Sequence, residues 1–142
     1  MDDKNNLVEQ LRAQAKAYLP SRLQTLALRY GFTLRRVAVK HNRSNWGSCS
    51  SLGNVNLNLN LVRLPVVLSD YVMIHELCHL KYMNHSRRFH ILLEKYCRDD
   101  YERLLSEGDA SPLSVSEKIR RSKARFPVSF TLRRALREWK LV

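Results

Sequence analysis

The chain has 142 residues and a formal net charge of +12, a length that allows one domain with a sizeable core but not two. Its longest apolar runs are far shorter than a bilayer span, and the polar N-terminus MDDKNN lacks the pattern of a secretion signal, so we expect no membrane partner. The three cysteines are an odd number with no C-x-x-C spacing, which indicates a reduced, cytoplasmic protein rather than a disulfide framework.

The N-terminal part of the chain reads as helical scaffold followed by a strand. Apolar residues recur at helical spacing over residues 7–30. Pro20 lies in the middle of this stretch and predicts a kink or two abutting helices, with Gly31 ending the second. A strand is predicted at 33–41, and the Asn-, Ser- and Gly-rich stretch at 42–53 predicts a loop and turn.

Residues 54–61 read NVNLNLNL, a strict alternation of Asn with Val or Leu. This pattern is typical of a half-buried strand with one apolar face and one amide-bearing face. We expect it to pair antiparallel with 33–41 through a turn at 50–53. An extended substrate can add to an exposed edge strand by main-chain hydrogen bonds. The amide face is therefore either a substrate-docking surface or simply a solvated one.

The next stretch carries the chemistry, because it contains H-E-x-x-H at His75, Glu76 and His79. Each residue of a helix advances about 100° around the axis, so the two histidines lie one turn apart on one face. Glu76 flanks them, where a carboxylate can take a proton from a metal-bound water. The motif can also arise by chance, but these polar groups would be costly to bury in so apolar a helix without a metal.

A hydrolytic zinc site needs a third protein ligand, and His85 is the best candidate. On a continuous helix it would lie about 240° beyond His79 and could not share its face. We therefore predict that the helix, at about 66–83, ends at a corner carrying His85. Ser86 would then cap a second helix that Gly108 closes.

The C-terminal part is strongly basic. Residues 112–142 contain nine Lys or Arg and two Glu, so we divide the chain into a domain at 1–110 and a basic, helical extension at 111–142. Helices are predicted at about 115–125 and from about Thr131. Such an extension either binds nucleic acid or is a solvated helix with no polyanionic partner, and the sequence leaves both open.

Several further residues are candidates for supporting roles. Catalysis needs a donor for the oxyanion, for which Tyr71, Tyr82 or an arginine are candidates. His90 is either a supporting group near a ligand or an ordinary, partly buried histidine. A metal-bound histidine nearly always donates its other ring N–H to an acceptor. The candidate acceptors are Asp70, Glu94 and Asp99.

The loop and the metal helix together resemble the YgjP-like metallopeptidases, bacterial zinc-dependent proteins related to the SprT and WLM groups. The motifs that carry the resemblance are N-W-G-S-C-S, the N-x-N-L strand, S-D-Y-V-M-I-H-E-L-C-H-L and N-H-S-R-R-F, within about residues 7–105. The resemblance implies a zincin-type α+β fold with N-terminal helices, a small antiparallel β-sheet, and an active-site helix followed by a second helix.

The same resemblance implies that the three histidines are the metal ligands and that Glu76 is the catalytic base. Trp46 and Cys49, within W-G-S-C, would line the cleft or lie next to the metal by their position in that motif. A Trp that packs a turn and a buried thiol are equally plausible interpretations.

We therefore predict a Zn²⁺-dependent metallopeptidase that hydrolyses polypeptides through a metal-bound water activated by Glu76. A zinc-dependent endoribonuclease is a competing hypothesis, since one such family shares the H-x-x-x-H-x-x-x-x-x-H spacing and a charge of +12 suits RNA. That family has Gly in place of Glu76, so the glutamate favours the peptidase. The sequence also allows a SprT-like protease recruited to nucleic acid by the basic extension, and a non-catalytic zinc-stabilised binding module.

Overall fold

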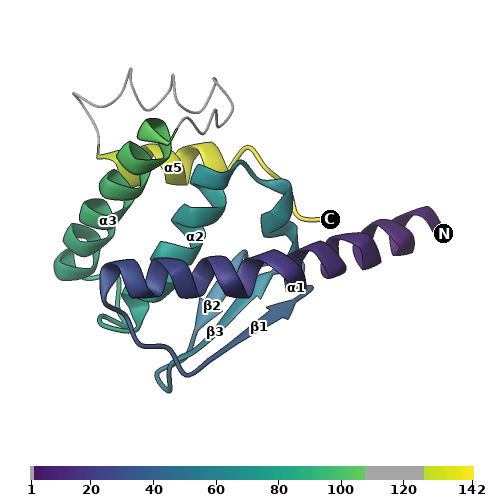
Figure 1. The fold of residues 1–142 in the computed structure, drawn as a ribbon, viewed down its shortest axis with the longest axis horizontal. Coiled ribbons are helices and arrows are strands. Elements are labelled where there is room, and N and C mark those ends of the chain that lie inside the picture. The colour runs from purple at the N-terminus through teal and green to yellow at the C-terminus, as the bar shows by residue number, and fades with distance from the viewer. Residues whose placement is uncertain (1, 108–126) are drawn as a thin grey trace.

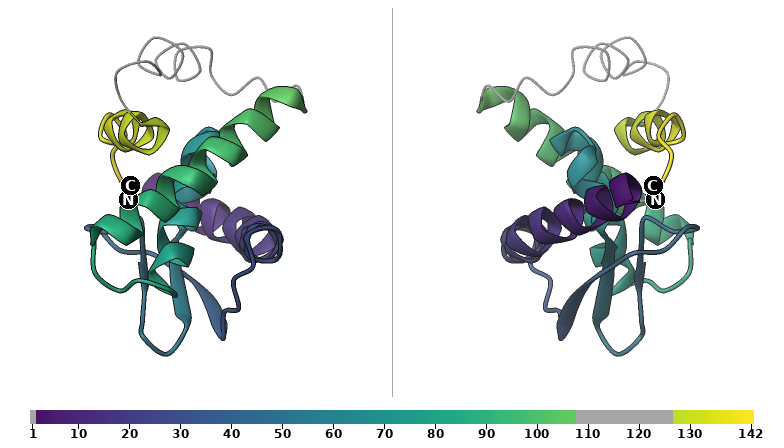
Figure 2. Two further views of the ribbon diagram at one scale, coloured as in Figure 1. Left: turned by 90° about the vertical axis from the view of Figure 1, so that its left-hand side faces the viewer. Right: turned by 90° about the vertical axis from the view of Figure 1, so that its right-hand side faces the viewer.

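The computed structural model describes residues 2–107 and 127–142. A small sheet lies at the bottom of Figure 1, α1 (Asp2–Tyr30) and α2 (Val66–His79) lie above it, and α5 (Val128–Leu136) lies above α2, on the side away from the sheet, as Figure 2 also shows. This arrangement confirms the predicted α+β class. None of the described helices is long and apolar enough to cross a bilayer.

The helix α1 runs through Pro20 as one element, although we expected a kink or two abutting helices there. The helix stays continuous because its apolar stripe is continuous: Leu19 and Leu23, on either side of the proline, are completely buried. Gly31 ends the helix as predicted, with the positive φ of 77° that a glycine adopts at little cost.

One mixed sheet has the strand order β1-β3-β2, formed by β1 (Arg36–Lys40), β2 (Gly47–Cys49) and β3 (Asn54–Asn58). The central strand, β3, is parallel to β1 and antiparallel to β2. The expected antiparallel pairing of the strands at 33–41 and 54–61 was therefore wrong. The turn after β2 closes β2 onto β3, which leaves β1 to join the opposite edge of β3 in the parallel direction.

Two of the asparagines along and beyond β3 do not belong to the solvated or docking face that the alternation suggested, since Asn58 and Asn60 are 1% and 0% exposed, whereas Asn54 and Asn56 are half-buried. The side-chain N–H groups of Asn58 donate to the carbonyls of Asn42 and Asn45 at 2.9 and 2.8 Å. Asn60 donates to Oδ1 of Asn58 at 2.8 Å and accepts the Val142 N–H at 2.8 Å. We call these bonds the amide bridge, because they join the loop before β2 to the C-terminal residues.

The 3-10 helix η1 (Leu59–Arg63) leads into α2, which ends at His79 and is shorter than the predicted 66–83. The helix α3 (Arg87–Ser106) follows a short corner. Ser86 caps it as predicted, because its hydroxyl accepts an N–H of the first turn at 3.3 Å.

The helix α5 belongs to the same core as the rest of the molecule. Val128, Leu132 and Ala135 are 1–4% exposed and pack with apolar residues of α2 and α3. The helix begins earlier than the predicted start at Thr131, directly after a proline that sets the backbone for a first turn. The helix predicted at 115–125 lies outside the described residues.

A buried cluster of arginine and aspartate side chains holds α1 against α2 and α3. Arg22 donates from Nε and Nη2 to the two oxygens of Asp70 at 3.0 and 2.6 Å, and Asp70 is fully buried. Asp100 lies 3.8 Å from Arg22 and 3.7 Å from Arg29. Burial, with the charge of Asp70 added to it, raises the pKa of Asp100 to about 9, while the two arginines oppose that rise. The cluster fixes α2 from its buried side.

Candidate metal centre

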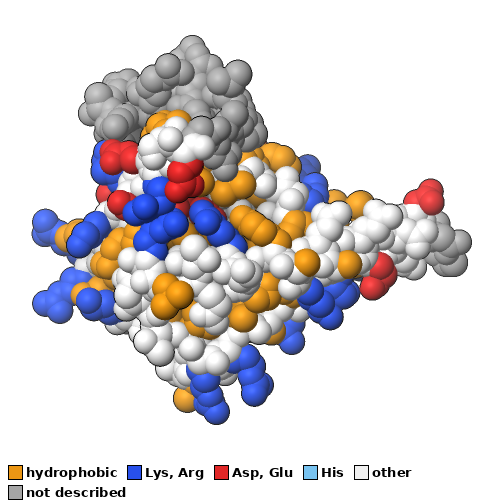
Figure 3. Space-filling model, in the orientation of Figure 1, with side chains coloured by type: hydrophobic (Ala, Val, Ile, Leu, Met, Phe, Trp, Pro, Cys, Tyr) orange, Lys and Arg blue, Asp and Glu red, His pale blue; other side chains and the backbone are white. Residues whose placement is uncertain are grey.

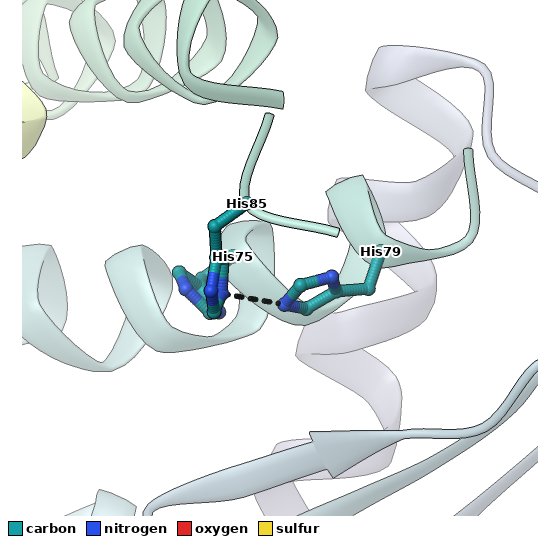
Figure 4. A group of neighbouring side chains, drawn as sticks. All are labelled: His75, His79 and His85. Carbon is teal, nitrogen blue, oxygen red and sulfur yellow. Dashed lines mark hydrogen bonds between the residues drawn. The ribbon is translucent and has the colours of Figure 1, made fainter. Parts of the chain in front are cut away.

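Three imidazoles meet between α2 and the corner that follows it (Figure 4). His75 and His79 lie one helical turn apart, with ring centroids 4.9 Å from each other. His85 points back from the corner, and its ring lies 5.3 Å from that of His75 and 4.8 Å from that of His79. One ring nitrogen of each histidine lies within 4.8 Å of the other two. The structure thus brings together the three residues that the sequence singled out.

The donor set and its spacing fit a zinc ion. Zn–N bonds of about 2.0–2.1 Å in tetrahedral geometry place two ligand nitrogens about 3.3–3.4 Å apart. The Nε2 atoms of His79 and His85 are 3.1 Å apart, close to that value, and the full set is somewhat wider. The pKa of His85 is lowered, mainly by loss of hydration and further by the neighbouring His75 and His79. A lowered pKa favours the neutral imidazole, which is the form that binds metal.

The chain around His79 explains why α2 ends there. Nδ1 of His79 lies 3.0 Å from the carbonyl oxygen of Tyr82, so its N–H can donate to that carbonyl and leave Nε2 free. The backbone N–H groups of Leu80 and Lys81 donate to carbonyls only three residues back, at 2.9 and 3.1 Å, which tightens the last turn. These bonds turn the chain sharply after His79 and bring His85 back over α2.

The three carboxylates expected to orient the ligand rings bond elsewhere, so that expectation was wrong. Asp70 binds Arg22 in the buried cluster. Glu94 accepts the backbone N–H of Ser129 at 2.8 Å, and Asp99 accepts the Tyr30 hydroxyl at 2.8 Å. The acceptor at His79 is a main-chain carbonyl, which no residue type in the sequence reveals.

Phe89 forms an apolar floor under the three rings, a role that we did not predict. Its ring stacks on that of His79 at 4.5 Å and meets those of His75 and His85 edge-on at 5.1 and 5.0 Å. The side chain is fully buried. The only signal in the sequence was its place in the first turn after the capping Ser86, and that place predicted no more than core packing.

Glu76 lies between the histidines and the strand β2. It is 6% exposed, and its Oε2 is 3.3 Å from Nδ1 of His75. A Cβ atom at Gly47 would lie 3.2 Å from Cγ of Glu76 and 3.2 Å from the carbonyl oxygen of Asn56. The glycine of W-G-S-C is therefore what lets the strand pass so close to the carboxylate, and the sequence alone did not predict this role.

Two pockets open beside this centre, and α5 contributes to the walls of both. The strand-side pocket has a volume of about 520 Å³ and lies between β2, α2 and the C-terminal residues. The corner-side pocket has a volume of about 570 Å³ and lies between α2, α3 and α5. Tyr71, His75 and Arg133 line both of them. The walls supplied by α5 were not predicted, because the basic composition of that segment placed it outside the domain.

The remaining candidates are distributed around these pockets. Trp46 lines the strand-side pocket, and His90 lines the corner-side pocket with its ring 6.1 Å from that of His85. Tyr71 is buried, which raises the pKa of its hydroxyl and keeps it protonated. Cys49 is half-buried, donates to the carbonyl of its neighbour at 3.5 Å, and has its pKa raised by burial to about 11. Tyr82 contributes its carbonyl to His79.

Comparison with known proteins identifies the family of the chain. No curated protein matches it. Among solved structures, the crystal structure of the metallopeptidase zymogen of Pyrococcus abyssi abylysin is 22% identical, covers 70% of this chain and 93% of its own, and has a TM-score of 0.47. The family model of the YgjP-like metallopeptidase domain matches residues 2–106, which include the three histidines and Glu76. The chain belongs to the YgjP-like metallopeptidase family.

Proposed function

We propose that this metallopeptidase depends on zinc held by His75, His79 and His85, and that Glu76 is its catalytic base. The observation that carries the proposal is the convergence of three imidazole nitrogens within 4.8 Å of one another beside a buried carboxylate. Membership of the family supports a polypeptide substrate. A zinc ion bound there would lower the pKa of a water molecule from 15.7 to about 7 and polarise the scissile carbonyl.

The chain's own residues supply the proton transfers. Glu76 accepts the proton of the attacking water and delivers it to the leaving amine. Tyr71, kept protonated by burial and placed beside His75 in both pockets, donates a hydrogen bond to the developing oxyanion. The strand order makes β2 an edge of the sheet beside Glu76, so we place the extended substrate against β2 and not against β3.

Replacement of Glu76 by Gln tests the role of the base. We expect zinc content, measured by elemental analysis, to be retained while hydrolysis of casein falls by about 100- to 10,000-fold. The matched control is Glu94→Gln, at a second carboxylate that lines the corner-side pocket; the amide keeps an acceptor oxygen for the Ser129 N–H, and this variant should stay active. Undiminished turnover by the Glu76 variant would refute the assignment.

The same assays separate the peptidase from the competing ribonuclease hypothesis. Purified protein is incubated with casein and with structured RNA, each with and without a chelator. The proposal requires chelator-sensitive cleavage of casein and no cleavage of RNA. Bound zinc without cleavage of either would instead indicate a non-catalytic zinc module.

Binding of nucleic acid by the basic extension stays a prediction, as does the cytoplasmic location. Five of the nine Lys and Arg residues of 112–142 fall within 118–125, outside the described residues. On the face shown in Figure 3, the Lys and Arg side chains lie at several separate places.

A further inference from the structure

Two arginines of α5 and its C-terminal cap line the strand-side pocket, next to the three histidines and Glu76. Arg133 and Arg137 both line the strand-side pocket, together with Glu76 and His75. They are four residues apart, within the helix and at its C-terminal cap, so their side chains leave it in the same direction, one turn apart. Arg133 also reaches the corner-side pocket. Both lie beyond residue 106, where the match to the family ends.

These arginines differ from those that hold the fold together. Arg22, Arg29, Arg98 and Arg103 each face a carboxylate of the buried cluster or of α3. The ion pairs among the described residues do not include Arg133 or Arg137, and both side chains are exposed. Their charge is therefore available to a ligand.

The position of that charge is set by the rest of the fold. The buried residues of α5 anchor it on α2 and α3, while the amide bridge holds the chain that follows it. Arg63 adds a bond from Nη1 to the carbonyl of Lys140 at 2.6 Å. Arg133 shares both pockets with Tyr71 and His75, and Arg137 shares the strand-side pocket with them. The backbone that carries the two arginines is thus anchored on both sides of them.

The balance of charge in the strand-side pocket favours an anion. Its lining contains two arginines against one carboxylate, Glu76. Apolar side chains of the same wall, Leu136 and Trp139, lie next to the arginines. A guanidinium group recognises a carboxylate through paired N–H donors, and a partly apolar surround strengthens such a contact.

We propose that Arg133 and Arg137 form a carboxylate-binding subsite that selects polypeptides with an acidic group close to the scissile bond. The inference rests on the proposed function, since it places the subsite beside Glu76. The acidic group is either an Asp or Glu side chain or the C-terminal carboxylate of the substrate. Peptides bound along β2 would face this subsite from across the pocket.

The test is a cleavage profile of a complex peptide mixture, read by mass spectrometry. Wild-type protein should cut with a carboxylate enriched about tenfold at one fixed position, and Arg133→Gln with Arg137→Gln should remove that enrichment. The double variant Arg133→Glu with Arg137→Glu should instead cut peptides in which Lys or Arg is enriched at that same substrate position. The matched control is Arg134→Gln, on the same helix, whose guanidinium lies 6.0 Å from the ring of Phe130 and lines neither pocket.

A second mixture with amidated C-termini separates the two sources of the carboxylate. Loss of cleavage on amidation assigns the subsite to the chain end, and retained cleavage with the same enrichment assigns it to a side chain. Cleavage without any preference for a carboxylate, or a preference that survives in the double Gln variant, would overturn the subsite and leave the peptidase standing.

Binding measured without turnover keeps the two proposals apart. The Glu76→Gln protein is titrated with peptides that differ only by Glu or Gln, and with the amidated and free forms of one peptide. About tenfold tighter binding of the acidic form, lost in the double Gln variant, supports the subsite even if the wild type cleaves nothing. Equal affinities overturn it. Because both arginines are exposed, we expect the variants to keep the wild-type melting temperature.

Discussion

Replacement of Gly47 by Ala should slow catalysis without displacing the metal ligands. The new Cβ would lie 3.2 Å from Cγ of Glu76, 3.2 Å from the carbonyl oxygen of Asn56 and 3.4 Å from Cγ1 of Val72. Asn56 is paired within the sheet, so the side chain of Glu76 is the group that gives way, by a few tenths of an ångström.

The size of the effect follows from that displacement. A misplacement of 1 Å costs about 100-fold in rate, so a few tenths of an ångström predict a kcat lowered roughly three- to tenfold. The assay is steady-state hydrolysis of a peptide that the wild type cleaves, with zinc content measured on the same sample. We expect zinc content to be unchanged, because none of the three atoms nearest to the added Cβ belongs to a histidine.

A matched substitution separates this effect from a loss of stability. Gly31 ends α1 with a φ of 77° and has nothing within 4 Å of an added Cβ. Gly31→Ala should therefore cost about 1 kcal/mol of stability and leave kcat unchanged. A folded, zinc-loaded Gly47→Ala protein with the wild-type kcat would refute the claim that the glycine positions Glu76.

Three further predictions concern the third ligand, the amide bridge and the buried ion pairs. His85→Ala should weaken zinc binding by about 100-fold or more in competition with a chelator, whereas His90→Ala should bind zinc as the wild type does. Asn60→Leu leaves the partners of the buried amide unpaired and should lower the free energy of unfolding by about 2–4 kcal/mol in urea. The pKa of Asp100 is raised from an unfolded value of about 3.9 to about 9, so the folded state keeps a proton that the unfolded state releases. The free energy of unfolding should therefore fall as pH rises from about 5 to 9, and Asp100→Asn should flatten that dependence; an equally steep fall in the variant would contradict it.

The sequence predicted the features whose cause is local. The spacing of His75, Glu76 and His79 needs only helical geometry, and the meeting of His85 with them needs only a corner of the right length. Ser86 and Gly31 act within a single turn of a helix, so the residue type alone indicates the helix end. The assignment of the histidines as metal ligands and of Glu76 as the base stays a proposal.

The features that the sequence did not predict depend on contacts between distant segments. Alternating Asn and Leu indicated a strand at 54–61, but not that it would end at Asn58 or lie at the centre of the sheet with β1 parallel to it. Asn58 and Asn60 looked like surface residues because their partners, a loop carbonyl and the main chain of Val142, carry no signal in the sequence. Basic composition marked residues 111–142 as an extension, yet α5 is buried against the metal-site helix.

The amide bridge has a practical consequence for anyone who shortens this protein. A truncation at residue 106, where the family match ends, would remove the main-chain partner of Asn60 and uncover the apolar surface that Val128 and Leu132 now cover. If a protein cut at residue 106 failed to bind nucleic acid, a damaged fold would explain the failure as well as the loss of the basic extension. Substitution of the lysines and arginines at 118–125 by neutral residues keeps Val142 and the apolar residues of α5 in place. Such a variant tests whether the basic extension binds nucleic acid without removing any part of the core.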